Sequence, residues 1–258
     1  NIIMENIKIS LVPSHLYRED IEKNLEHFTE LTQDIKTDVL VFPEMFTTGF
    51  TNASDQLAVK MDSNPVKWMK DLSKKMDALV MGSMIIVENG NYFNRLLAAF
   101  PDGKLQTYDK RHLFSLVNEN DFYTAGTEKL IINYKGWKIS PLICYDLRFP
   151  AWCRNTEMEE VIIFVANWPE KRQKHWNLLL NARAIENQSY VVGVNRIGED
   201  ANGIPYNGRS AVYDFWGNEM ILANDLLGVF TIEISKNNLK EHRQRFGFWR
   251  DRDTFEIQ

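Results

Sequence analysis

Cys144 is the residue best placed in this sequence to act as a nucleophile. It follows the largely apolar run 139–143 and is soon followed by Asp146 and Arg148. This pattern predicts a buried strand that ends in a sharp turn, with the thiol at the corner. The thiolate is the reactive form of cysteine, so such a position favours nucleophilic catalysis. A single cysteine after an apolar strand is also commonly a small buried hydrophobic residue, and Cys144 alone leaves both interpretations open.

Two other charged residues follow apolar or strand-like runs in the same way. Glu44 comes directly after the short apolar run 39–43, and Lys110 follows the expected strand 103–109. A carboxylate at a strand end could act as a general base, although a capping or surface acid is the ordinary alternative. Lys110 could stabilise a thiolate or an oxyanion, or it could belong to a basic surface cluster with Arg111 and His112.

Glu119 lies in segment 118–126, which is rich in turn-forming residues, so it is either a solvated loop acid or a support that orients Lys110. A glutamate, a lysine and a cysteine are chemically sufficient for acyl transfer. The glutamate takes the thiol proton, the sulfur attacks an electrophilic carbon, and the lysine stabilises the resulting negative oxygen together with a backbone N–H after the cysteine. The protonated glutamate then gives its proton to the leaving amine, and as a carboxylate it later activates water.

Composition restricts the class of protein. The chain has 258 residues and a net charge of −5, which does not favour nucleic acid or an anionic membrane as a partner. With Cys144 and Cys153 as its two cysteines, we expect reduced thiols and a cytoplasmic location. We expect no signal peptide, and no apolar stretch approaches the roughly 20 residues of a membrane helix. We also expect no cofactor, and no metal because the histidines are scattered along the sequence.

Periodicity predicts alternating strands and helices. Strands are expected at 7–12, 39–43, 78–87, 92–100, 103–109, 139–143, 161–166, 190–195, 209–213 and 229–234, and helices at 19–36, 65–76 and 171–187. This order indicates an α/β fold with layered mixed sheets. We expect a single domain over 4–240, followed by a charged tail, 241–258. The aromatic residues of that tail, Phe246, Phe248 and Trp249, could be solvated or could pack on a partner subunit.

Three ordered blocks, 42–44, 109–113 and 143–150, resemble the signature motifs of the nitrilase superfamily of carbon–nitrogen hydrolases. The resemblance implies that Cys144 is the nucleophile, Glu44 the general base and Lys110 the oxyanion cation. It also implies that Glu119 supports Lys110 and that the backbone N–H of Tyr145 shares the oxyanion site. The fold implied is a four-layer α-β-β-α sandwich with mixed sheets, assembled as a homodimer or a higher homo-oligomer.

Segments 166–176 and 182–188 further resemble the YafV-type omega-amidases. That branch implies hydrolysis of the terminal amide of a small 2-oxo dicarboxylic acid monoamide, 2-oxoglutaramate or 2-oxosuccinamate, with release of ammonia. The substrate carboxylate needs a cation or hydrogen-bond donors. The candidates are Arg148, Arg172 and Arg196, although Arg148 could instead pair with Asp146 or the sheet end. Phe114 and Trp168 could line the pocket, or they could be core aromatic residues.

Other functions stay open at this point. The same cysteine could attack a nitrile, or the amide of another carboxylated substrate such as deaminated glutathione. A thiol protease would need His112 within hydrogen-bond reach of Cys144. A non-catalytic binding protein is disfavoured by the intact Glu44, Lys110 and Cys144. We therefore expect an amidase whose partners are a small amide and water, with Cys153 inert.

Overall fold

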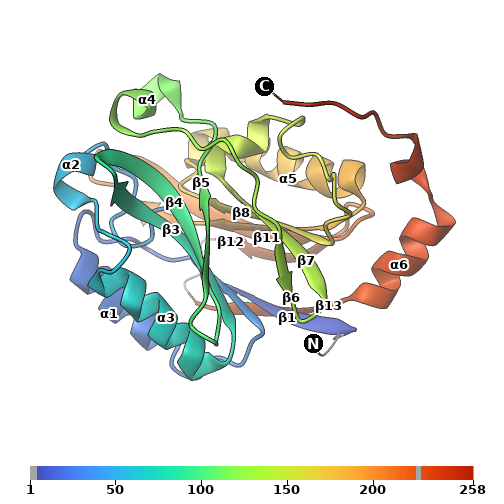
Figure 1. The fold of residues 1–258 in the computed structure, drawn as a ribbon, viewed down its shortest axis with the longest axis horizontal. Coiled ribbons are helices and arrows are strands. Elements are labelled where there is room, and N and C mark those ends of the chain that lie inside the picture. Colours follow the sequence, from blue (N-terminus) through green and yellow to red (C-terminus); the bar gives the residue numbers. More distant parts are fainter. Residues whose placement is uncertain (1–4, 225–227, 258) are drawn as a thin grey trace.

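Two β-sheets stacked face to face form the centre of the computed structural model, which describes residues 5–224 and 228–257 (Figure 1). The first sheet has the strand order β13-β1-β2-β3-β4-β5, and the second has β10-β11-β9-β8-β7-β6, with β12 paired to β11. The strands are β1 (Asn6–Leu11), β2 (Val39–Val41), β3 (Leu79–Glu88), β4 (Asn91–Ala99), β5 (Leu105–Asp109), β6 (Ile132–Tyr134), β7 (Trp137–Ile143), β8 (Val161–Ala166), β9 (Tyr190–Asn195), β10 (Ile197–Glu199), β11 (Pro205–Tyr213), β12 (Glu219–Asn224) and β13 (Phe230–Ser235).

Helices cover the two outer faces of this pair of sheets. Helices α1 (Ile21–Leu31) and α3 (Asn64–Met76) lie on the first sheet, where Phe28 and Met69 pack with Leu40 of β2. Helix α5 (Gln173–Asn187) lies on the second sheet and buries Trp176 and Leu180 in the main core. The order of layers is therefore α-β-β-α, with mixed sheets, and it confirms the expected fold class (Figure 1).

The parallel strands explain why distant segments meet. Strand β2 runs parallel to β1 and β3, and β8 runs parallel to β7 and β9. Alternating side chains of β2 face opposite layers, since Val39 and Val41 join the core between the sheets whereas Leu40 joins the core under α1 and α3. The carboxyl ends of β2, β7 and β8 deliver Glu44, Cys144 and Asn167 to one pocket.

Several elements differ from the sequence expectations. Helix α1 ends at Leu31 rather than near 36, and strand β12 and helix α6 (Lys236–Arg245) were not expected. Helix α6 carries the chain across the predicted limit at residue 240, and its Arg243 donates to the carbonyls of Gln188 and Glu159 at 2.8 and 2.6 Å. The outer limits of the predicted domain and tail, residues 4 and 258, lie outside the described ranges.

The remaining helical segments are short. They are α2 (Ser54–Leu57), α4 (Glu119–Phe122) and the 3₁₀ helices η1 (Ser115–Val117), η2 (Cys144–Arg148), η3 (Glu170–Arg172) and η4 (Phe248–Asp251). Within residues 5–224 and 228–257, no helix combines the length and apolar character needed to cross a membrane.

Candidate active site

A buried lysine lies between two buried carboxylates, and the lysine and one of these acids, Glu44, line the pocket. Lys110 follows β5 and is 1% exposed, while Glu44 and Glu119 are 0% exposed. The Nζ atom of Lys110 donates to Oε1 of Glu44 at 2.9 Å and to both carboxylate oxygens of Glu119 at 2.9 Å. The structure therefore brings together three of the residues that the sequence singled out. A buried charge without partners would be costly, and here each charge has an opposite one within hydrogen-bond distance.

The protonation state of Lys110 follows from these contacts. Burial alone would lower the pKa of Lys110, because it removes the ammonium group from water. The charges of Glu119 and Glu44 act in the opposite direction and hold the pKa of Lys110 well above its usual range. Lys110 is therefore a fixed positive charge and not a proton donor or acceptor at neutral pH.

The segment after β5 positions both Lys110 and Glu119. The backbone N–H of Lys110 continues the β4–β5 pairing by donating to the Asn94 carbonyl at 3.0 Å. Glu119 begins α4, and its Oε2 also accepts the backbone N–H of Phe114 at 2.6 Å. Gly126 closes the segment by donating to the Lys110 carbonyl at 2.9 Å, and a Cβ at Gly126 would lie 2.2 Å from the carbonyl oxygen of Asp109. Only glycine fits this approach.

The turn at Cys144 is held by one buried carboxylate. Cys144 directly follows β7 and is the first residue of η2. Its φ is +44°, a value that few non-glycine residues adopt. Asp146 accepts the backbone N–H of Ile143 at 3.0 Å, the hydroxyl of Tyr108 at 2.7 Å, and His112 through its backbone N–H and Nδ1 at 3.0 and 2.8 Å. These contacts fix the sharp turn that the sequence predicted.

The Cys144 thiol lies against the acidic side of the buried cluster. Burial and the charge of Glu44 raise the pKa of Cys144 well above its usual range, and Lys110 opposes them only in part. Cys144 and Glu44 line the same pocket. The resting sulfur therefore keeps its proton, and Glu44 is in position to remove it when an electrophile arrives.

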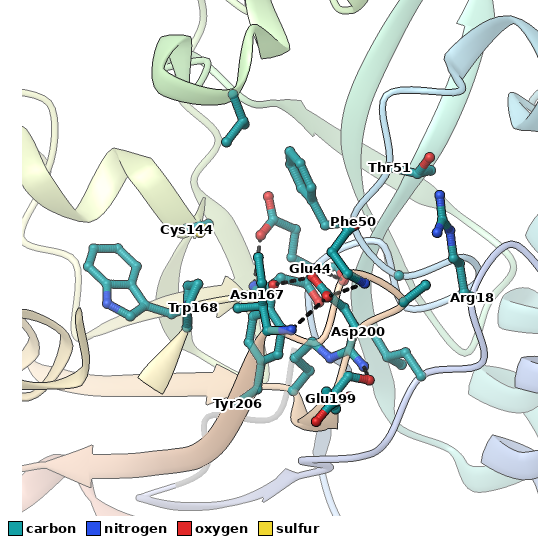
Figure 2. Close-up of a pocket in the computed structure, with 18 of the residues that line it drawn as sticks. Arg18, Glu44, Phe50, Thr51, Cys144, Asn167, Trp168, Glu199, Asp200 and Tyr206 are labelled. Atoms are coloured by element: carbon teal, nitrogen blue, oxygen red, sulfur yellow. Dashed lines mark hydrogen bonds between the residues drawn. The ribbon is translucent and has the colours of Figure 1, made fainter. Parts of the chain in front are cut away.

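The pocket above these groups has a volume of about 1020 Å³. Figure 2 shows Cys144 and Trp168 toward one side, Glu44 and Asn167 near the centre, and Arg18 and Thr51 on the other side. The sequence-derived candidates for substrate contact also lie on its wall: Phe114, Tyr145, Arg148, Trp168, Arg172 and Arg196.

Three arginines of the pocket wall, Arg148, Arg172 and Arg196, form no ion pair with a carboxylate in the part of the chain that the structure describes. Arg148 stacks on Trp168 at 4.7 Å, and Arg172 lies over the ring of Phe114 at 5.2 Å. Neither pairs with an acidic side chain of residues 5–224 and 228–257 within 4.0 Å. Burial and the charge of Arg172 lower the pKa of Arg148, as expected for two neighbouring cations. The alternative pairing of Arg148 with Asp146 is not observed, because Asp146 is occupied by the turn.

His112 and Cys153 are both held by contacts with Asp146. His112 is held by Asp146, and its ring stacks on Phe149 with centroids 3.7 Å apart. Its Nδ1 is thus committed to Asp146, which gives His112 a structural role. Cys153 is buried and donates to the Asp146 carbonyl at 3.1 Å, and burial raises the pKa of its thiol to about 12. Cys153 is therefore an inert thiol at neutral pH.

Sequence reasoning missed two asparagines that contact Glu44. Asn167, directly after β8, donates its backbone N–H to Oε2 of Glu44 at 2.8 Å and its side chain to the Glu44 carbonyl at 2.7 Å. Asn94 of β4 donates to Oε1 of Glu44 at 2.9 Å. The end of the apolar strand before Asn167 was a usable signal, whereas Asn94 lies inside a strand and carries none. Among the described residues, no group of three acidic, histidine or cysteine side chains is arranged to hold a metal ion.

Known proteins resemble this chain over almost its whole length. Residues 8–244 match the model of the carbon–nitrogen hydrolase family. The omega-amidase YafV of Escherichia coli strain B is 42% identical over 98% of this chain and 100% of its own. The 2-oxoglutaramate amidase of Bacillus subtilis is 36% identical over 86% of this chain and 87% of its own.

A solved structure shows the same similarity in three dimensions. The protein XC1258 of Xanthomonas campestris, a CN-hydrolase superfamily member with an arsenic adduct in its active site, superposes with a TM-score of 0.97. It is 41% identical and covers 99% of this chain and 100% of its own. The family match and these relatives confirm the resemblance stated from the three sequence blocks. The chain therefore belongs to the carbon–nitrogen hydrolase family.

Proposed function

We propose that this enzyme hydrolyses the terminal amide of a small 2-oxo dicarboxylic acid monoamide, such as 2-oxoglutaramate or 2-oxosuccinamate, and releases ammonia. One observation carries the proposal. The Cys144 thiol and the buried carboxylate of Glu44 lie in the same pocket as two arginines, Arg148 and Arg172, that have no acidic partner among the described residues. The thiol accounts for the attack on the amide, and the arginines account for recognition of a carboxylate. The relatives named as omega-amidase and 2-oxoglutaramate amidase support the same substrate class.

The first half-reaction forms an acyl-enzyme. Glu44 takes the proton of the Cys144 thiol, and the sulfur electron pair forms a bond to the amide carbon. Negative charge then develops on the amide oxygen, where the Lys110 ammonium and the backbone N–H of Tyr145 stabilise it. Glu119 keeps Lys110 in place through its two hydrogen bonds. The C–N bond breaks as Glu44 returns its proton to the nitrogen, which leaves as ammonia.

The second half-reaction frees the enzyme. A water molecule enters the position that ammonia has left, and Glu44 removes one of its protons. The water oxygen attacks the thioester carbon, and the same oxyanion groups stabilise the second tetrahedral intermediate. The C–S bond breaks, the carboxylic acid product departs, and the proton held by Glu44 returns to sulfur. Each half-reaction thus uses Glu44 once as a base and once as an acid.

We expect the enzyme to release ammonia from 2-oxoglutaramate at a higher kcat/KM than from any uncharged amide or nitrile. A coupled ammonia assay measures turnover of those compounds in a substrate panel that release ammonia, and turnover of deaminated glutathione, whose amide nitrogen leaves in a dipeptide, is followed by the 2-oxoglutarate formed. The panel contains 2-oxoglutaramate, 2-oxosuccinamate, valeramide, an aliphatic nitrile and deaminated glutathione. The last is included because a pocket of about 1020 Å³ has room for a longer carboxylated amide. Activity confined to the nitrile, or a preference for valeramide, would contradict the proposal.

Arg148→Ala and Arg172→Ala are each expected to raise KM for 2-oxoglutaramate about 10-fold, because each loses a charged hydrogen-bond donor to the substrate carboxylate. The KM for valeramide, which has no carboxylate, should change little. Arg18→Ala is the matched control, since Arg18 lines the same pocket but is paired with Glu19 at 3.2 Å. An equal rise of KM for both substrates would show that these arginines shape the pocket rather than bind the carboxylate.

We further propose a homodimeric or larger assembly and a cytoplasmic location. The outer surface of α5 exposes Leu178 and Ile185, one heptad apart, at 60% and 50%. Trp216, on the loop before β12, is 52% exposed, and such apolar surface favours contact with a second copy. Both cysteines are free thiols, which suits a reducing compartment.

A further inference from the structure

Asn94 contacts both carboxylates of the buried cluster from below the pocket. It is fully buried on β4, and its Nδ2 lies 2.9 Å from Oε1 of Glu44 and 3.5 Å from Oε1 of Glu119. Its Oδ1 is also buried and accepts no hydrogen bond from the described residues. The amide group is therefore present as a donor to the two acids. Asn94 is not among the described residues that line the pocket, so it acts through the acids and not on the substrate.

The hydrogen bonds of Glu44 distinguish its two oxygens. A carboxylate oxygen offers about two acceptor sites. Oε1 accepts Lys110 Nζ and Asn94 Nδ2, each at 2.9 Å, so both of its sites are filled. Oε2 accepts the backbone N–H of Asn167 at 2.8 Å, and no other donor among the described residues, which leaves its second acceptor site open. The proton of the thiol can therefore be received at Oε2 without displacing another donor.

We propose that Asn94 is a positioning residue that fills the second acceptor site of Oε1 and so confines proton transfer to Oε2 of Glu44. The inference rests on the proposed amidase function and names the atom that serves it. The S–H bond breaks, an O–H bond forms at Oε2, and the electron pair left on sulfur attacks the amide carbon. The same Oε2 then gives this proton to the nitrogen as the C–N bond breaks. A proton placed on Oε1 would instead have to displace Lys110 or Asn94 from that oxygen.

Asn94 also has an electrostatic consequence for the pair formed by Glu44 and Cys144. A donor to the ionised carboxylate favours that form, so without Asn94 the pair takes up a proton at higher pH. The other ionisable groups that face Glu44 are Lys110 after β5, Glu119 on α4 and Tyr123 after α4, and all remain in an Asn94 variant. A change in the acid limb of the pH profile therefore reports the loss of the amide donor.

The test compares the wild type with Asn94→Leu, which keeps the branched outline of the side chain but not the donor, and with the smaller Asn94→Ala. Asn155→Ala is the matched control, because Asn155 is also a buried donor, to the carbonyl of Glu159 at 2.8 Å, but does not line the pocket. Two pH profiles are recorded for each protein: kcat/KM for 2-oxoglutaramate, and the rate of Cys144 alkylation by iodoacetamide followed by mass spectrometry. Thermal unfolding confirms that each variant is folded.

We expect both Asn94 variants to move the acid limb of both profiles upward by about one pH unit and to lower kcat about 10- to 100-fold with little change in KM. Asn155→Ala should lose thermal stability and keep the wild-type limb. Folded Asn94 variants whose limbs coincide with the wild type would overturn the proposal, and so would a large rise in KM at unchanged kcat. If the wild type does not hydrolyse 2-oxoglutaramate, the proposed function fails, while the alkylation profile still decides the role of Asn94.

Discussion

Replacement of Cys144 by alanine is expected to lower kcat/KM for 2-oxoglutaramate by at least about 10⁴-fold, because the side chain that forms the acyl bond is gone. The fold should survive, since the turn is held by Asp146 through contacts that do not involve the sulfur. Ammonia release at saturating substrate measures the loss, and a thermal melt checks the fold.

Cys153→Ala is the matched control for this prediction. It removes the other thiol, which is buried and does not line the pocket among the described residues. This variant should lose some stability and keep most of its activity. Substantial activity in Cys144→Ala, or a comparable loss in Cys153→Ala, would contradict the assignment of Cys144 as nucleophile.

The second large effect is expected for Glu44→Gln, which should lower kcat about 10²- to 10⁴-fold, because a glutamine cannot accept the thiol proton or return one to the leaving nitrogen. The fold should tolerate the change. Lys110 retains its hydrogen bonds to both oxygens of Glu119, so the buried cluster still contains one cation and one anion.

The same variant should make Cys144 easier to alkylate at low pH. The charge of Glu44 is one of the causes that raise the pKa of Cys144, while Lys110 lowers it. Removing the Glu44 charge therefore lowers the pKa of Cys144, and alkylation by iodoacetamide should extend to lower pH. Loss of turnover together with a more reactive thiol separates general acid–base catalysis from simple damage to the site. An alkylation profile displaced to higher pH would contradict the role given to Glu44.

The sequence predicted the residues that stand where an apolar strand stops. Glu44 and Cys144 each follow an apolar run of the kind that forms a buried strand. A charged residue or a thiol directly after such a run can be recognised in the sequence alone. Their order along the chain, together with Lys110, carried the family resemblance. The layered fold followed partly from periodicity and partly from that resemblance, since periodicity alone indicated only layered mixed sheets.

The sequence could not predict contacts that depend on strand register. Asn94 reaches Glu44 because β4 and β5 pair Arg95 with Asp109, which brings Lys110 beside Asn94. Asp146 accepts hydrogen bonds from three separate segments, which the sequence does not show. An ion pair between Asp146 and Arg148 was therefore considered possible.

Helix α6 was missed for lack of an apolar pattern. Helix α6 has Leu239 as its one large aliphatic residue, so it shows no helical periodicity. Its buried Arg243 is held instead by carbonyls of distant segments. Strand β12, which pairs with β11, does contain an apolar run at 220–223, but no strand was expected between those at 209–213 and 229–234.

Mass spectrometry of an acid-quenched reaction with 2-oxoglutaramate tests the central claim most directly. We predict that, within the first turnovers, the peptide containing Cys144 gains the mass of the substrate less one ammonia, as a thioester that hydroxylamine removes. The peptide containing Cys153 should stay unmodified. Full turnover with the acyl group on another residue, or with no acylated Cys144 at any quench time, would contradict the account.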